Sequence, residues 1–111
     1  MIDPKVIEKC QKIANDKKVK NLPKYFDISE FLFSNRFSGD RFLSLDAKNV
    51  VKFDKTIGYV YKNTILNVEV VLFYNKIRNS TNASIYFNDY GIKIERLPLK
   101  KLVEIIKLIN S

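Results

Sequence analysis

The chain has 111 residues, 46% of them hydrophobic and 13% aromatic, and it carries a formal net charge of +8 without any histidine. This length suits a single domain over residues 1–111 with enough apolar material for a core, which argues against intrinsic disorder. With no histidine and one cysteine, Cys10, the chain cannot supply a zinc site or a histidine-dependent nucleophile, so we expect no metal and no cofactor.

The sequence also indicates where in the cell the protein is located. No apolar run approaches the ~18 to 20 residues that a membrane span requires, and the N-terminal residues lack the apolar stretch of a signal peptide. A lone cysteine cannot form an intramolecular disulfide, which favours a reducing compartment. We therefore expect a cytoplasmic protein without a membrane partner. The richness in lysine and asparagine points to a virus or a low-GC microbe.

The first predicted element is a helix over residues 4–17. Asp3 is a suitable capping residue and Pro4 suits the first helical position. Apolar residues then recur at the spacing of one helical stripe, at Val6, Ile7, Cys10, Ile13 and Ala14. A basic connector over residues 17–24 follows and includes Pro23.

Residues 25–35 are ambiguous. Asp27 and Glu30 resemble a capping pair, which favours a brief helix. The same aromatic-rich stretch would also suit a short strand.

From residue 36 onward the apolar periodicity turns to two, as in strands. We predict a turn at 38–40 and strands over 41–45, 49–53, 56–62, 65–76, 83–88 and 92–96. The segment 65–76 is the strongest, because alternate residues share one apolar face, namely Leu66, Val68, Val70 and Leu72. This order predicts an antiparallel meander of four to six strands.

The last element begins at Pro98 and has the stripe of an amphipathic helix: Leu99, Leu102, Val103, Ile106 and Ile109. Ile105 and Leu108 broaden the stripe enough to cover a sheet and a second surface. The predicted fold class is therefore α+β, with an N-terminal helix, an antiparallel sheet and a C-terminal amphipathic helix packed on it. The broad stripe also favours a homodimer through the C-terminal helix.

Positive charge is concentrated at the N-terminus, where residues 1–24 contain seven lysines and three acids. An uneven positive field attracts polyanions, nucleic acid above all. The plain alternative is a solvated lysine-rich surface. Charge alone does not decide between the two.

Tyrosines in the predicted strands add a second indication. If Val70 and Leu72 face the core, we expect tyrosine rings and cations on the other face, where bases would stack on rings while lysines follow the phosphates. The predicted function is non-catalytic nucleic-acid binding that favours single-stranded DNA or RNA. The predicted site has cations at Lys17, Lys18, Lys20, Lys52, Lys62, Lys76 and Arg78 and stacking rings at Tyr59, Tyr61 and Tyr74.

Two alternatives stay open. One is a homodimeric protein-interaction or regulatory module. The other is a small histidine-free nuclease in which strand carboxylates such as Asp54 and Glu69 hold Mg²⁺. Glu69 and Glu95 both lack the lysine two residues later that such nucleases carry on a strand, so we lean against catalysis.

The stretch from Asn67 to Ile109 resembles in layout the positive-cofactor-4-like transcription-coactivator family. The resemblance is carried by Tyr90-Gly91-Ile92-Lys93-Ile94 and by Leu99, Leu102 and Ile106 of the helix that follows. In that family a curved antiparallel sheet binds single-stranded DNA and the next helix dimerises. The resemblance covers less than half of the chain and assigns no residue a role.

Overall fold

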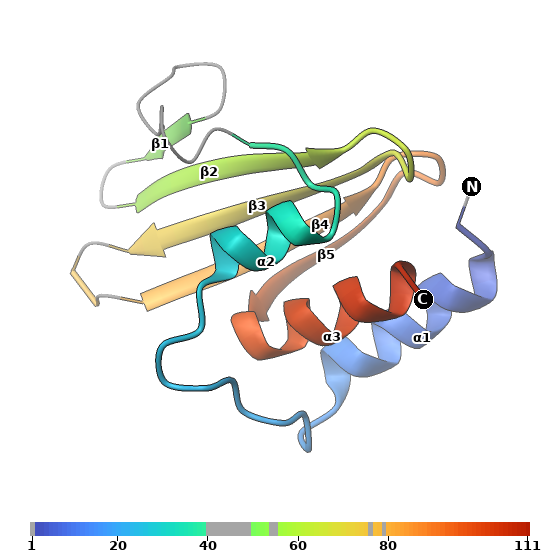
Figure 1. Ribbon diagram of the computed structural model, residues 1–111, viewed down its shortest axis with the longest axis horizontal. Coiled ribbons are helices and arrows are strands. Elements are labelled where there is room, and N and C mark those ends of the chain that lie inside the picture. Colours follow the sequence, from blue (N-terminus) through green and yellow to red (C-terminus); the bar gives the residue numbers. More distant parts are fainter. Residues whose placement is uncertain (1, 40–49, 54–55, 76, 79) are drawn as a thin grey trace.

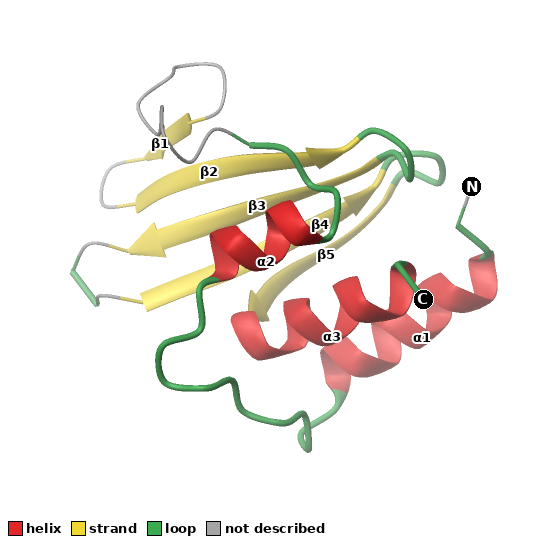
Figure 2. Ribbon diagram, in the orientation of Figure 1, coloured by secondary structure: helices red, strands yellow, loops and turns green. Residues whose placement is uncertain are grey.

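The computed structural model describes residues 2–39, 50–53, 56–75, 77–78 and 80–111. Its elements follow the order α1 (Pro4–Asn15), α2 (Ile28–Ser34), β1 (Val50–Phe53), β2 (Thr56–Asn63), β3 (Val68–Asn75), β4 (Ser80–Phe87), β5 (Ile92–Pro98) and α3 (Leu99–Ile109). The strands form one antiparallel sheet in the order β1-β2-β3-β4-β5, and the three helices lie on one side of it (Figures 1 and 2). The predicted α+β meander between terminal helices is confirmed.

Helix α1 begins as its sequence predicts and ends slightly earlier. The Asp3 carboxylate accepts a hydrogen bond from the Lys5 amide at 2.8 Å, and Pro4 is the first helical residue. The helix ends at Asn15 because Asp16 adopts an extended backbone. At this end the Lys101 ammonium of α3 donates to the Ala14 carbonyl at 2.7 Å, which satisfies one of the carbonyls that a helix C-terminus leaves unpaired.

The ambiguous segment 25–35 contains the brief helix rather than a strand. The Glu30 amide donates to the Asp27 carboxylate at 3.1 Å, so the predicted capping pair begins α2. Leu32 of this helix is fully buried, and Phe37, which comes after the helix, is also buried in the core. These two side chains anchor α2 over the sheet.

The strands match the predicted order but not every predicted end. Strand β3 starts at Val68 rather than at residue 65, because residues 64–67 form a turn. In that turn the Asn63 side chain accepts from the Leu66 amide at 3.0 Å, and Asn67 has a φ of 52°. Strand β4 starts at Ser80, three residues earlier than predicted.

The predicted strand 41–45 and Asp40 of the predicted turn lie outside the described residues. Ser38, at the start of that turn, forms an isolated bridge to the end of β2. Its amide donates to the Lys62 carbonyl and its carbonyl accepts from the Lys62 amide, both at 2.8 Å. The chain after α2 is thereby tied to the sheet.

Helix α3 packs on β4 and β5 and lies beside α1, which also contacts β5, as Figure 1 illustrates. The second surface predicted for its broad stripe is therefore α1. Ile105 is 0% exposed and Leu108 is half-buried against the core. Both residues are covered within one chain, so the breadth of the stripe is no longer a reason to expect a homodimer. Within the described ranges, no helix has the length and apolarity to cross a membrane.

Candidate nucleic-acid interface

The predicted stacking tyrosines lie on the helix-covered side of the sheet. Tyr59 pairs with Leu72 and Tyr61 with Val70, and paired residues of antiparallel strands point to the same face. Tyr74 follows Leu72 by two residues and shares its face for the same reason of alternation. The expectation of these rings on the opposite, open face is therefore wrong. For Tyr61 the burial is nearly complete, at 4% exposure.

The three rings nevertheless come together. They line one pocket of about 300 Å³, which we call the tyrosine pocket, formed by Ile28, Ser29, Tyr59, Tyr61, Leu72, Tyr74 and Thr81. The Tyr61 hydroxyl lies 3.0 Å from the Ser29 hydroxyl at its α2 wall. Behind it the Phe33 ring meets the Tyr61 ring edge-on, with centroids 6.3 Å apart. Among the residues that the structure describes, those lining the pocket have uncharged side chains.

Lysines gather on a different surface, around the connector between α1 and α2. Lys20 of the connector and Lys107 of α3 line the same hollow of about 460 Å³. The Lys100 ammonium donates to the Asn21 side chain at 3.2 Å, which holds the connector against α3. We use the name connector surface for the lysines of the connector and of the part of α3 beside it, namely Lys17, Lys18, Lys20, Lys24, Lys100 and Lys107. Two carboxylates are described beside these lysines: Glu104 lies 3.9 Å from the Lys107 ammonium, and Asp16 accepts from the Lys18 amide.

The connector surface also carries an aromatic ring. Tyr25 is 88% exposed, and the Lys24 ammonium lies 5.6 Å from its ring centroid. A solvent-exposed tyrosine beside a lysine is a cation–π pair and an available stacking surface. Lys24, Tyr25, Lys100 and Lys107 were not among the site residues predicted from the sequence. Tyr25 could have been found from the sequence, because an aromatic residue that directly follows a lysine at the end of a basic connector suggests an exposed ring beside a cation.

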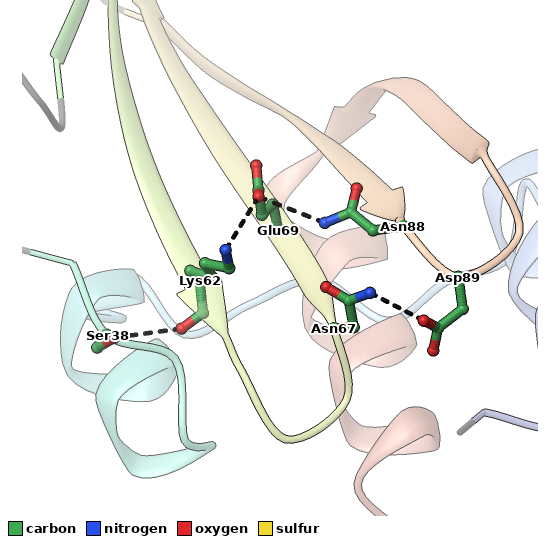
Figure 3. Close-up of polar contacts among 6 residues, drawn as sticks. All are labelled: Ser38, Lys62, Asn67, Glu69, Asn88 and Asp89. Carbon is green, nitrogen blue, oxygen red and sulfur yellow. Dashed lines mark hydrogen bonds and ion pairs between the residues drawn. The ribbon is translucent and has the colours of Figure 1, made fainter.

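The open face of the sheet has cations, but carboxylates accompany them. The Lys62 ammonium lies 3.8 Å from the Glu69 carboxylate, which also accepts from the Asn88 amide at 3.3 Å (Figure 3). Lys93 lies 3.3 Å from Glu95 on the same face. The close-up shows Lys62 and Glu69 on neighbouring strands beside the turns that join β2 to β3 and β4 to β5. Lys62, a predicted site residue, thus has a carboxylate partner on the neighbouring strand.

The remaining predicted cations lie elsewhere. Arg78 is exposed in the turn between β3 and β4, where its amide donates to the Asn75 side chain at 3.0 Å. Lys52 lies in β1 opposite Ile57, and Lys76 is outside the described residues. The predicted site is therefore divided among the connector surface, the tyrosine pocket and the open face, rather than forming one surface.

The carboxylates of the nuclease alternative do not form a metal site where the structure describes them. Glu69 is paired with Lys62 and Asn88, and Asp54 lies outside the described residues. Across the described part of the chain, no three Cys, Asp or Glu side chains come close enough to share a cation.

Connector surface and tyrosine pocket remain as the two places where predicted site residues gather. The first offers cations and an exposed ring, and the second offers an uncharged hollow with aromatic walls. Comparison of the chain with protein-family models, with curated proteins and with solved structures found no match.

Proposed function

We propose that this chain is a non-catalytic nucleic-acid-binding protein that holds phosphates on the connector surface and favours single strands. One observation carries the proposal: lysines from two distant parts of the sequence meet there, with Lys20 and Lys107 in the same hollow. The connector, residues 17–24, carries four lysines and no acidic residue, and its Lys20 shares the hollow with Lys107 and Glu104 of α3. Such a field attracts a polyanion and releases the counterions condensed on it.

The preference for single strands is supported by the exposed ring of Tyr25. Base–ring stacking contributes about 1–3 kcal/mol per base and needs bases that are not already stacked in a duplex. Lys24 stands over that ring at 5.6 Å, so a stacked base and a bound phosphate would be neighbours along one strand. A cytoplasmic location belongs to the same proposal, supported by the lone buried thiol of Cys10.

The test is fluorescence anisotropy with a labelled 12-nucleotide single strand and its duplex, between 50 and 200 mM salt, concentrations across which phosphate-dependent binding changes strongly. Binding through about four phosphates predicts a log–log salt slope near −3 for the single strand, at roughly −0.7 per phosphate. Undetectable binding at the lower salt, or a flat salt response, would overturn the proposal.

A matched pair of double variants locates the site. Lys20→Gln with Lys107→Gln should weaken binding and make the salt slope shallower by about 1.4, at roughly 0.7 for each lost contact. Lys62→Gln with Lys93→Gln changes the net charge equally on the open face and should leave the slope unchanged. Equal effects of the two pairs would show that net charge, and not the connector surface, drives binding.

A further inference from the structure

The tyrosine pocket is chemically unlike the connector surface. Its walls are the rings of Tyr59, Tyr61 and Tyr74 with the aliphatic side chains of Ile28 and Leu72. Such walls favour a flat, uncharged ring system, because aromatic faces stack on one another and a charge would be desolvated without a counterion. A phosphate group is therefore not a ligand for the interior of this pocket.

The pocket also has hydroxyl groups for the edge of a bound ring. The Ser29 and Tyr61 hydroxyls lie 3.0 Å apart, and Thr81 adds a third hydroxyl side chain from β4. A hydroxyl both donates and accepts hydrogen bonds, so these groups can pair with carbonyl or amino groups on the edge of a heterocycle. A nucleobase has this combination of flat faces and a polar edge.

Two cations lie close in sequence to wall residues of the pocket. Lys24 precedes the wall residue Ile28 by four positions, and a segment of that length spans at most about 14 Å. Arg78 precedes Thr81 by three positions, which span at most about 11 Å. Both side chains are exposed. The phosphates next to an inserted base would thus lie within reach of positive charge.

From this arrangement we infer that the tyrosine pocket takes one unpaired base of the bound strand. The inference rests on the proposed function and assigns a second role within it: the connector surface holds phosphates, and the pocket holds a base. Only an unstacked base can enter, so the pocket distinguishes single strands from an intact duplex.

The experiment compares two labelled probes of equal length and charge. One is a 12-unit abasic deoxyribose-phosphate strand, and the other carries a single thymine at its centre. Because stacking is worth about 1–3 kcal/mol per base, the thymine should tighten binding between about 5-fold and about 150-fold. Anisotropy at low salt measures both affinities with the same protein sample.

Variants of pocket residues test whether the tighter binding of the single-thymine probe, called the gain below, depends on the pocket. Tyr74→Ala and, separately, Tyr59→Leu should abolish the gain while leaving affinity for the abasic strand unchanged. Tyr86→Ala removes a half-buried ring from the opposite face of the sheet and should keep the gain. Far-ultraviolet circular dichroism identifies a variant that fails to fold, and two independent pocket variants keep the test decisive.

The outcomes separate this inference from the proposed function. Equal affinity of wild type for both probes overturns the base pocket and leaves phosphate binding standing. A gain that survives both pocket variants also overturns it, since the base then binds elsewhere. No binding of either probe overturns the proposed function and this inference together. Binding of free thymidine without any gain in the single-thymine probe would make the pocket a small-molecule site instead.

Discussion

The hydroxyl of Tyr61 lies 3.0 Å from the hydroxyl of Ser29, and this contact joins strand β2 to helix α2. It closes one wall of the tyrosine pocket and holds the ring of Tyr61 under the helix.

The Tyr61–Ser29 contact should be measurable as a coupling energy. Tyr61→Phe keeps the ring and removes one hydroxyl, so we expect a loss of about 1 kcal/mol in the free energy of unfolding. Ser29→Ala should cost a similar amount, and the double variant less than the sum, because each single variant leaves its former partner unpaired. Urea unfolding of the four proteins measures the cycle. Strict additivity would contradict the hydrogen bond.

Gly39 should be intolerant of a side chain because of Tyr61. A Cβ at residue 39 would overlap the Tyr61 ring, which is 4% exposed and cannot move into solvent without leaving the core. Gly39→Ala is expected to destabilise the fold by about 1–3 kcal/mol, the usual cost of overpacking. Thermal unfolding in a Tyr61→Ala background supplies the control. There the alanine should cost almost nothing, and an undiminished cost would point to a backbone effect instead.

Arg96 should tolerate replacement by glycine better than Lys93, which lies three residues earlier in β5. Ala83 pairs with Leu97 and Ile85 with Ile94, so Glu95 and Arg96 both oppose Ser84 in a bulge, where Arg96 has a φ of 58°. Glycine adopts that conformation without steric cost, so Arg96→Gly should be neutral or stabilising by up to about 1 kcal/mol.

Lys93→Gly is the comparison on the same strand, where φ is not positive, and it should cost about 0.5–1 kcal/mol. Guanidinium unfolding of both variants gives the difference. A larger loss for Arg96→Gly than for Lys93→Gly would mean that contacts of the arginine side chain outweigh its backbone conformation.

Cys10 should be unreactive until the protein opens. The thiol is fully buried, and this burial raises its pKa from 9.0 to about 11. The unfolded chain releases the thiol proton near pH 9 while the folded chain retains it until about pH 11, so this group's contribution to stability is complete below pH 9 and declines as pH rises through that window. Ellman's reagent at pH 8 should react at the rate of opening, far more slowly than with the urea-unfolded chain.

Cys10→Ala is the control for the pH effect. Between pH 9 and 11 its free energy of unfolding should fall less steeply than that of wild type, because the variant lacks the thiol whose pKa burial raises. Rapid labelling of the folded protein, or parallel pH profiles for the two proteins, would contradict burial of the thiol.

Local signals predicted the elements well for identifiable reasons. The capping pair Asp27 and Glu30 starts α2, and Asp3 with Pro4 starts α1, since caps act within one helical turn. The turn after β2 was predicted as strand, because Ile65 and Leu66 continue the apolar pattern while the Asn63 side chain closes the turn. A pattern of apolar residues does not reveal a hydrogen bond of this kind.

The candidate site was harder to predict than the elements. Alternation along β3 already assigns Tyr74 to the face of Leu72, whereas the faces of Tyr59 and Tyr61 depend on the register between β2 and β3. Their common pocket depends further on α2, a helix that begins some thirty residues earlier in the chain. Lys20 and Lys107 likewise meet through the packing of the connector on α3.

By itself, then, the sequence determined the two terminal helices, the antiparallel meander, the excess of positive charge and the lack of imidazole chemistry. Caps and periodicity depend on residues that are close together in the chain, and composition does not depend on their order at all. Only the tertiary structure decided that the tyrosines share a pocket beneath α2 and that the lysines gather beside α3. Register and packing bring together residues that are distant in the chain, and no local pattern records which of them will meet.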